Sequence, residues 1–174
     1  MELQELKDLL KKSGIVGAGG AGFPTYAKLS YDVNTVILNG AECEPLFRVD
    51  QNLLATHTDE ILTGLSLVVE AVGAKEGILA YKEHYHEADE AVERVIYKYP
   101  RLRKKLLKDG YPAGDEVVLV YETTGRVVPQ GGIPINVGAM VMNVETAFNV
   151  YNAVEKKEPV TYSKDFNRFY SNVP

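Results

Sequence analysis

The sequence predicts an α/β fold: a parallel, Rossmann-like sheet flanked by helices, with an N-terminal helix and a glycine-rich loop before it. Short apolar runs rich in β-branched residues alternate along the chain with longer amphipathic segments. This alternation is typical of the strands and covering helices of a parallel sheet. The second observation is that residues 17–22 contain four glycines, which gives a backbone that can adopt positive φ and approach a ligand closely.

The composition limits the class of protein. The chain has 174 residues, of which 45% are hydrophobic and 25% are charged, and this suits one compact domain with a sizeable core. We expect residues 1–156 to form this domain and residues 157–174 to be a tail or the start of a further domain. A net charge of −5 gives no electrostatic reason to expect nucleic acid as a partner. No window approaches 18 consecutive apolar residues, so no membrane span is expected.

The cysteine and histidine content excludes several kinds of site. A single cysteine, Cys43, excludes an internal disulfide and any iron–sulfur cluster held by this chain alone, because such clusters usually need four thiolates. This cysteine usage favours a reducing cytoplasm. The three histidines have no cysteine or carboxylate at metal-ligand spacing, so we expect them on the surface and expect no metal site.

The first half of the chain predicts two helices, a strand and a long third helix. Leucines recur at helical spacing over residues 2–12, and a short helix follows Pro24, which suits a first helical turn. Residues 33–39 form a β-branched apolar run and predict a buried strand. Residues 50–72 predict one long amphipathic helix that ends at Gly73.

The next segment predicts a second strand at residues 77–82 and a second covering helix at residues 86–98. Residues 102–107 are ambiguous, because their propensity favours a helix while the alternation of elements favours a strand. We expect a strand there.

The last part of the chain is also partly ambiguous. Residues 116–124 carry valines that favour a strand, but a Gly-Asp entrance and a glycine exit are typical of helix caps. We therefore expect a helix. Residues 127–138, with two prolines and three glycines, predict a surface loop. A short strand at 139–142 and a helix to about residue 155 follow.

The glycine-rich loop predicts a ligand site. Its backbone N–H groups and the helix that follows would favour an anion such as phosphate. Gly17, Gly19 and Gly22 match the dinucleotide fingerprint G-x-G-x-x-G, but that fingerprint requires a strand before the loop. A helix is expected there instead, so ordinary Rossmann binding is disfavoured. The structural alternative is a tight surface turn.

Polar side chains follow three of the expected strands, and we expect them to converge on this loop, because ligands of open α/β sheets bind beyond the carboxyl ends of strands. The side-chain amides of Asn39 and Asn143 carry both a donor and an acceptor, as the polar edges of a fused heterocycle require. Lys28 would add a positive charge for a phosphate or an anionic ring. The turns concerned are residues 39–44, 111–116 and 143–146.

Each candidate has a structural alternative. Phe23 and Tyr31 offer stacking faces, yet aromatic residues are more often part of the core. Asn39 and Asn143 are also common turn residues. The acidic residues of the turn at 42–44 are equally consistent with solvated side chains.

Four motifs in order resemble a known family. They are Gly-Ala-Gly-Gly-Ala-Gly-Phe-Pro-Thr with Lys28 three residues on, Asn-Gly-Ala-Glu-Cys-Glu-Pro, Tyr-Pro-Ala-Gly-Asp-Glu and Asn-Val-Glu-Thr. In this order they resemble the NADH- and FMN-binding domain shared by the flavin subunit of respiratory complex I and the C subunit of Rnf-type ferredoxin:NAD oxidoreductases. They look closer to the Rnf-type branch. The resemblance covers residues 10 to 155, approximately.

The resemblance implies a flavin-dependent NADH dehydrogenase domain. FMN would be the cofactor and NADH the substrate, and electrons would pass to an iron–sulfur cluster in a missing domain or partner protein. The flavin would carry the redox chemistry, so no catalytic side chain is implied. The implied location is the cytoplasm, including the periphery of a membrane complex.

The same motifs assign binding residues. The set implied to contact FMN is Gly17, Gly19, Gly20, Lys28, Asn39, Glu42 and Asn143. The set implied to contact NADH is Glu44, at the nicotinamide, with Phe23 and Tyr31 at the adenine.

Two positions depart from the complex I pattern: Ala41 replaces an aspartate and Met142 replaces an asparagine. The sequence also stops before the cluster-binding cysteines of the family, so it is either an excised domain or a short relative that needs a partner. The alternative function is therefore an interaction module of a redox complex that keeps the fold without tight cofactor binding.

Overall fold

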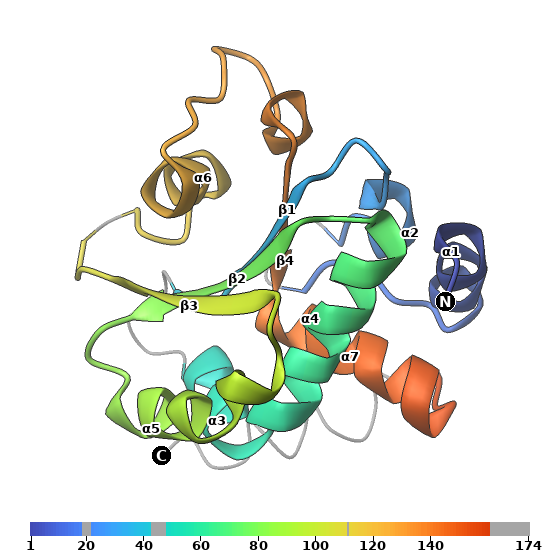
Figure 1. The fold of residues 1–174 in the computed structure, drawn as a ribbon, viewed down its shortest axis with the longest axis horizontal. Helices are drawn as coiled ribbons and strands as arrows, with labels where there is room; N and C mark the ends of the chain where they lie inside the picture. The colour runs from blue at the N-terminus through green and yellow to red at the C-terminus, as the bar shows by residue number, and fades with distance from the viewer. Residues whose placement is uncertain (19–21, 43–47, 111, 161–174) are drawn as a thin grey trace.

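A four-stranded, all-parallel sheet forms the centre of the computed structural model, which describes residues 1–18, 22–42, 48–110 and 112–160. The strand order is β3-β2-β1-β4 (Figure 1). The strands are β1 Thr35–Asn39, β2 Glu76–Lys82, β3 Leu102–Leu107 and β4 Ala139–Asn143. The expected α/β fold with a parallel sheet is confirmed, including the strand in the ambiguous segment at residues 102–107.

Helices cover both faces of this sheet, and residues of β1 alternate between the two resulting cores. Val36 and Leu38 face the larger core, whereas Ile37 faces a smaller one, and all three are fully buried. Burial on both faces explains the continuous apolar run of this strand, since parallel sheets are covered on both sides.

The larger core lies against four helices that cross one face of the sheet (Figure 1). They are α3 Val49–Thr56, α4 Thr58–Val72, α5 His86–Val95 and α7 Val144–Tyr151. Two short helical segments, η1 Ile96–Lys98 and η3 Asn152–Lys156, extend α5 and α7. Within the described residues, no helix is long and apolar enough to cross a membrane.

The opposite face carries α6 Glu116–Thr124 and the short η2 Pro134–Val137 (Figure 1). The expectation of a helix here is confirmed, and its caps explain it. The carboxylate of Asp115 accepts hydrogen bonds from the N–H groups of Val117 and Val118, at 2.9 and 3.1 Å. Gly125 ends the helix with φ of 72°, a left-handed conformation that glycine adopts without steric cost.

The expected single helix over residues 50–72 is wrong. The structure has two helices, α3 and α4, separated at His57, whose φ of −129° and ψ of 34° are not helical. The ring of His57 packs on Phe148 of α7 with 4.8 Å between ring centroids. The break thus coincides with a contact between segments far apart in sequence. The expected end at Gly73 is confirmed by its φ of 71°.

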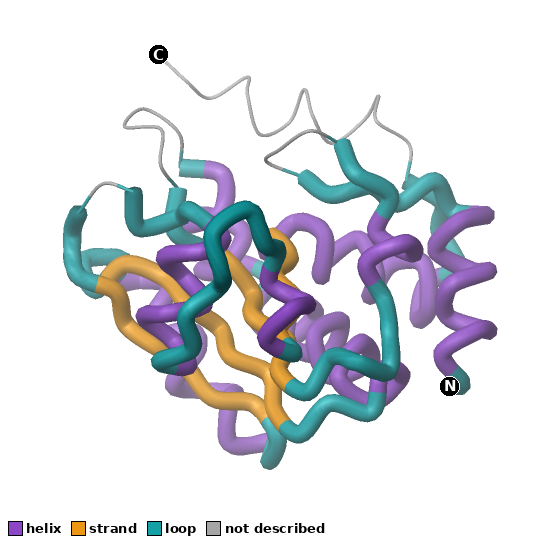
Figure 2. Tube along the Cα trace, turned by 90° about the horizontal axis from the view of Figure 1, so that it is seen from above, coloured by secondary structure: helices purple, strands orange, loops and turns teal. Residues whose placement is uncertain are grey.

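The N-terminal region contains α1 Leu3–Lys12 and α2 Thr25–Lys28, which lie together at one end of the molecule (Figure 2). Val16 and Pro24 form an isolated antiparallel bridge, and the N–H of Gly17 donates to the carbonyl of Phe23 at 2.8 Å. These contacts hold the two ends of the glycine-rich segment together. The segment leads into a helix of one turn, directly beside the outer strand β4.

Candidate functional site

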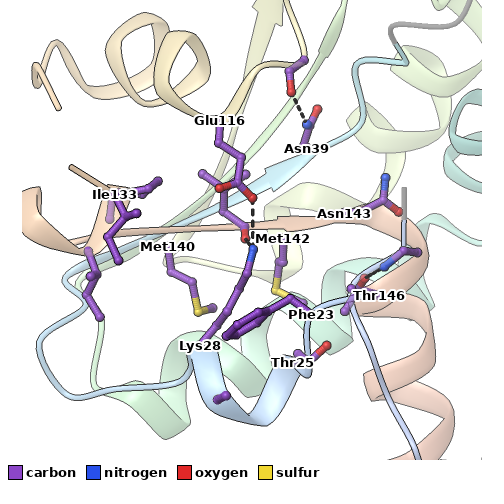
Figure 3. A pocket seen from close by; sticks show the side chains of 18 of the residues that line it. Phe23, Thr25, Lys28, Asn39, Glu116, Ile133, Met140, Met142, Asn143 and Thr146 are labelled. Atoms are coloured by element: carbon purple, nitrogen blue, oxygen red, sulfur yellow. Dashed lines mark hydrogen bonds and ion pairs between the residues drawn. The ribbon is translucent and has the colours of Figure 1, made fainter. Parts of the chain in front are cut away.

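A cavity of about 710 Å³ lies along β4, between this strand and the glycine-rich segment (Figure 3). Its walls come from the start of the glycine loop, α2, all of β4, the end of β1, residues 114–116 and residues 133–135. Segments more than one hundred residues apart therefore share one pocket. Its volume is typical of a site for a small organic ligand.

The ends of β1 and β4 meet at this pocket because Asn39 and Asn143 are paired in the parallel register. Asn39 donates from Nδ2 to the carbonyl of Gly114 at 3.0 Å, and its Oδ1 accepts from the N–H of Ala41 at 3.0 Å. The side chain thus ties the end of β1 to the turn before α6. These contacts fix which end of the amide is the donor.

Asn143 is the N-cap of α7. Its Oδ1 accepts from the N–H of Glu145 at 2.8 Å, and its Nδ2 donates to Oδ2 of Asp50 at 2.8 Å. Within the described residues, Asn39 and Asn143 each keep one N–H that no protein group accepts. Both side chains line the cavity, so two oriented amides are available to a ligand.

Lys28 supplies the positive charge of the pocket. Its Nζ lies 3.0 Å from Oε1 of Glu116, donates to the carbonyl of Val141 at 3.4 Å, and lies 6.0 Å from the ring centre of Phe23 (Figure 3). Among the described residues that line the cavity, Lys28 is the one lysine, and there is no arginine. Because an ammonium group has three hydrogens, one remains for a ligand.

The glycine-rich segment is attached to α7 through Thr146. The N–H of Ala18 donates to Oγ1 of Thr146 at 3.1 Å, and Thr146 is buried. The hydroxyl still has its own hydrogen to donate. The first turn of α7 therefore sets the position of the loop at the end of the cavity.

An acidic group lies directly behind the pocket wall. The pKa of Asp50 is raised to about 7, mainly by burial and to a smaller extent by the charge of Glu42. The hydrogen bond from Asn143 acts in the opposite direction and lowers this pKa. Burial also raises the pKa of Glu145. Oε1 of Glu42 accepts from the N–H of Val49 at 2.8 Å, whereas its Oε2 is buried and has no hydrogen-bond partner among the described residues.

The structure brings together part of the residue set expected from sequence. The members that line the cavity are Gly17, Phe23, Lys28, Asn39 and Asn143. Glu42 and Tyr31 are not among the lining residues. Glu42 instead binds the start of α3, and Tyr31 is 67% exposed. Gly19, Gly20 and Glu44 lie outside the described residues.

Several lining residues were not expected from the sequence to form the pocket, although Met142 was noted there as a departure from the complex I pattern. Met140 and Met142 lie on the pocket side of β4, and Ile133 and Ile135 contribute an apolar wall (Figure 3). Their spacing on one strand was available, but the sequence gives no sign that β4 is an edge strand. Among the described residues, no group of three or more His, Cys, Asp or Glu is arranged to hold a metal ion.

The chain matches the family model of the Nuo51 FMN-binding domain over residues 10–152. It belongs to this family. The resemblance to the flavin protein of complex I is thereby confirmed. Relatives include the cobalamin reductase PduS of Citrobacter freundii, which is 42% identical over 160 residues, with 92% of this chain and 35% of the relative covered.

A second relative is the C subunit of the Na(+)-translocating ferredoxin:NAD(+) oxidoreductase complex of Acetobacterium woodii. It is 38% identical, with 86% of this chain and 35% of the relative covered. Among solved structures, an NAD+-reducing [NiFe]-hydrogenase in the H2-reduced state aligns with a TM-score of 0.73 and 26% identity, covering 86% of this chain and 30% of that one. The chain spans about a third of the length of these relatives.

The residues that line the pocket suit FMN, the cofactor named in the description of the family. FMN has a flat fused ring with polar edges and an anionic phosphate group. The cavity offers the apolar side chains of Met140 and Met142, the free amide hydrogens of Asn39 and Asn143, and the ammonium group of Lys28. The face of the ring, its polar edge and the phosphate therefore each have a chemical counterpart among the lining residues.

Proposed function

We propose that this chain is a flavin-dependent NADH dehydrogenase domain that binds FMN in the β4 pocket and passes electrons to an iron–sulfur domain or partner protein. The observation that carries the proposal is the meeting of Lys28, Asn39 and Asn143 around one cavity beside the glycine loop, in a member of an FMN-binding family. We take residues 1–156 as this domain.

The side chains of the pocket would bind and orient the cofactor. The amides of Asn39 and Asn143 would donate to the polar edge of the ring, and Lys28 would offset negative charge. Met140 and Met142 would exclude water from one face. Bound FMN supplies hydride acceptance and stepwise release of electrons, which protein side chains do not provide.

Binding of NADH rests on the exposed aromatic ring beside the pocket. Phe23 lines the cavity yet is 51% exposed, which is unusual for a core residue and suits stacking on a planar ligand. We retain Tyr31 and Glu44 as proposed contacts of the adenine and the nicotinamide. The proposed location is the cytoplasm, at the periphery of a membrane complex when the electron-accepting partner is membrane-bound.

The second candidate is an interaction module without tight cofactor binding. The observation that favours it is the ion pair between Lys28 and Glu116, which offsets the positive charge of the pocket. Ala41 and Met142 also remove two polar side chains expected in the complex I branch.

Titration of the purified chain with FMN, followed by flavin fluorescence, tests the proposal. We expect quenching at micromolar protein, weakened by Lys28→Met and unchanged by Lys75→Met, which removes an exposed lysine of the loop before β2. Anaerobic NADH should then bleach the oxidised flavin band. Quenching without bleaching would indicate a flavin carrier reduced by another donor. No quenching would support the interaction module.

A further inference from the structure

Asp50 is connected to the pocket through one amide. Its Oδ2 accepts from Nδ2 of Asn143 at 2.8 Å, and the other end of that amide accepts from the N–H of Glu145 at 2.8 Å. Rotating the amide would lose both contacts, so Asp50 and the cap of α7 fix which N–H of Asn143 faces the cavity. Asp50 lies on α3 and is only 9% exposed.

Among the described residues, the charged groups that act on the pKa of Asp50 are both carboxylates. Glu42 follows β1, Glu145 lies in the first turn of α7, and Tyr85, which precedes α5, also interacts with the charge of Asp50. Burial and the charge of Glu42 raise the pKa of the Tyr85 phenol to about 12, so it is neutral at physiological pH. Within the described parts of the chain, no lysine, arginine or histidine forms an ion pair with Asp50, Glu42 or Glu145.

Buried carboxylates without a cation are costly, and proteins generally neutralise them by taking up a proton. Asp50 lies close enough to Glu42 for the charge of Glu42 to raise its pKa. Oε2 of Glu42 is itself buried without a partner among the described residues, so a second negative charge at Asp50 is costly, whereas a protonated carboxyl group is neutral and keeps one oxygen as an acceptor. Asp50 can therefore hold a proton and still accept the hydrogen bond from Asn143 with its second oxygen.

We propose that Asp50 is a positioning residue that orients Asn143 and takes up a proton from solvent, on average less than one per chain, when negative charge enters the pocket. The carboxylate and the proton form a neutral carboxylic acid, and no other bond is made or broken. The inference rests on the proposed binding of FMN. The charge comes either from the phosphate on binding or from the ring on reduction.

The direction of the coupling follows from electrostatics. The ligand-free pKa of about 7 means that Asp50 exchanges its proton near neutral pH. A nearby anion makes ionisation harder and raises this pKa further. Proton uptake is therefore greatest between the ligand-free and the ligand-bound pKa, and any step that introduces the negative charge becomes less favourable as pH rises through this interval.

The substitution Asp50→Asn distinguishes the uptake of a proton by Asp50 from its hydrogen bond with Asn143. An asparagine oxygen still accepts from Nδ2 of Asn143, so a purely structural role for Asp50 would survive, but the side chain no longer titrates. Asp8→Asn is the matched control, because it makes the same charge change at an exposed position on α1.

The first measurement is the carboxyl carbon resonance of Asp50, assigned from its loss in Asp50→Asn and followed from pH 4 to 9 in the ligand-free chain. We expect a midpoint near 7 that moves upward after FMN is added or after the bound flavin is reduced with dithionite. Titration at the ordinary value for an exposed aspartate would overturn the proposal.

The second measurement is the proton balance, obtained from calorimetric titrations in buffers of different ionisation enthalpy and from a pH indicator during dithionite reduction. We expect the wild type and Asp8→Asn to take up a fraction of a proton that Asp50→Asn does not. Repeating the titration and the reduction with riboflavin, which lacks the phosphate, distinguishes proton uptake caused by the phosphate from uptake caused by the reduced ring. Equal proton uptake in all three proteins at both steps would overturn the coupling, whereas failure of FMN to bind would overturn the proposed function itself.

Discussion

Asn39 and Asn143 lie opposite each other at the carboxyl ends of β1 and β4, and each binds a different distant element. Asn39 reaches the turn before α6 through the carbonyl of Gly114, and Asn143 reaches α3 through Asp50. Two adjacent amides therefore connect both faces of the sheet at the point where the pocket opens. A ligand that binds these amides contacts groups that the whole fold holds in place.

The hydroxyl of Thr146 is expected to set the position of the glycine loop. Thr146→Val keeps the shape of this buried side chain but removes the acceptor of the Ala18 N–H. Losing a buried hydrogen bond of this kind costs about 1.4 kcal/mol, so we expect FMN affinity to fall about tenfold. Fluorescence titration measures the change. Thr56→Val, an exposed threonine bonded within α3, should bind FMN like the wild type, and equal affinity in both variants would contradict the role.

The ion pair between Glu116 and Lys28 is expected to weaken anion binding. Glu116→Gln removes the negative charge that offsets Lys28, so FMN should bind a few-fold more tightly at low salt. The difference should shrink at about 1 M salt, where the screening length is about 3 Å. Glu122→Gln changes an exposed acid on the same helix and should have little effect. Weaker binding in Glu116→Gln would show instead that Glu116 holds Lys28 in its binding position.

Much of the fold follows from local sequence signals. The apolar run of β1 and the caps of α6 at Asp115 and Gly125 are readable from neighbouring residues. The strand at residues 102–107 was ambiguous because β3 is an edge strand rich in basic residues. The structure resolves this ambiguity: Leu102 and Leu107 are buried, and Lys104 pairs with acids of α5.

The features that the sequence did not predict are those that depend on contacts between distant segments. The helix break at His57 accompanies packing on Phe148 of α7, which local periodicity does not report. The strand-end rule placed Asn39 and Asn143 together, but the partner of Asn143 is Asp50, 93 residues away. The side of β4 that carries the pocket was also hidden, because strand order is not encoded in any single segment.

Gly64 is expected to be essential for the packing of α4 on α7. A Cβ atom at this position would overlap the backbone carbonyl of Ala147, and overpacking of this kind costs about 1–3 kcal/mol. We expect Gly64→Ala to lower the melting temperature by about 2–10 °C. Gly110→Ala is the control, since a Cβ there meets no atom within 4 Å. Equal melting temperatures would show that the two helices separate without cost.

Asp50 should also make the stability of the chain depend on pH. Its pKa is about 7 in the folded protein, against an ordinary value of 3.8, so between these values the folded state binds more protons than the unfolded state. The contribution of Asp50 to the free energy of unfolding must then decrease as pH rises from about 4 to about 7.

Asp50→Asn removes this contribution, so the difference in unfolding free energy between variant and wild type should grow over the same interval, by an amount of the order of a few kcal/mol. Urea unfolding at a series of pH values measures it. Other carboxyl groups add their own dependence; the pKa of Asp89, for example, is lowered by Lys104 and Tyr81. Groups remote from Asp50 titrate alike in both proteins, so the difference reports Asp50 together with its neighbours Glu42 and Glu145. A constant difference from pH 4 to 7 would mean that Asp50 is ionised throughout.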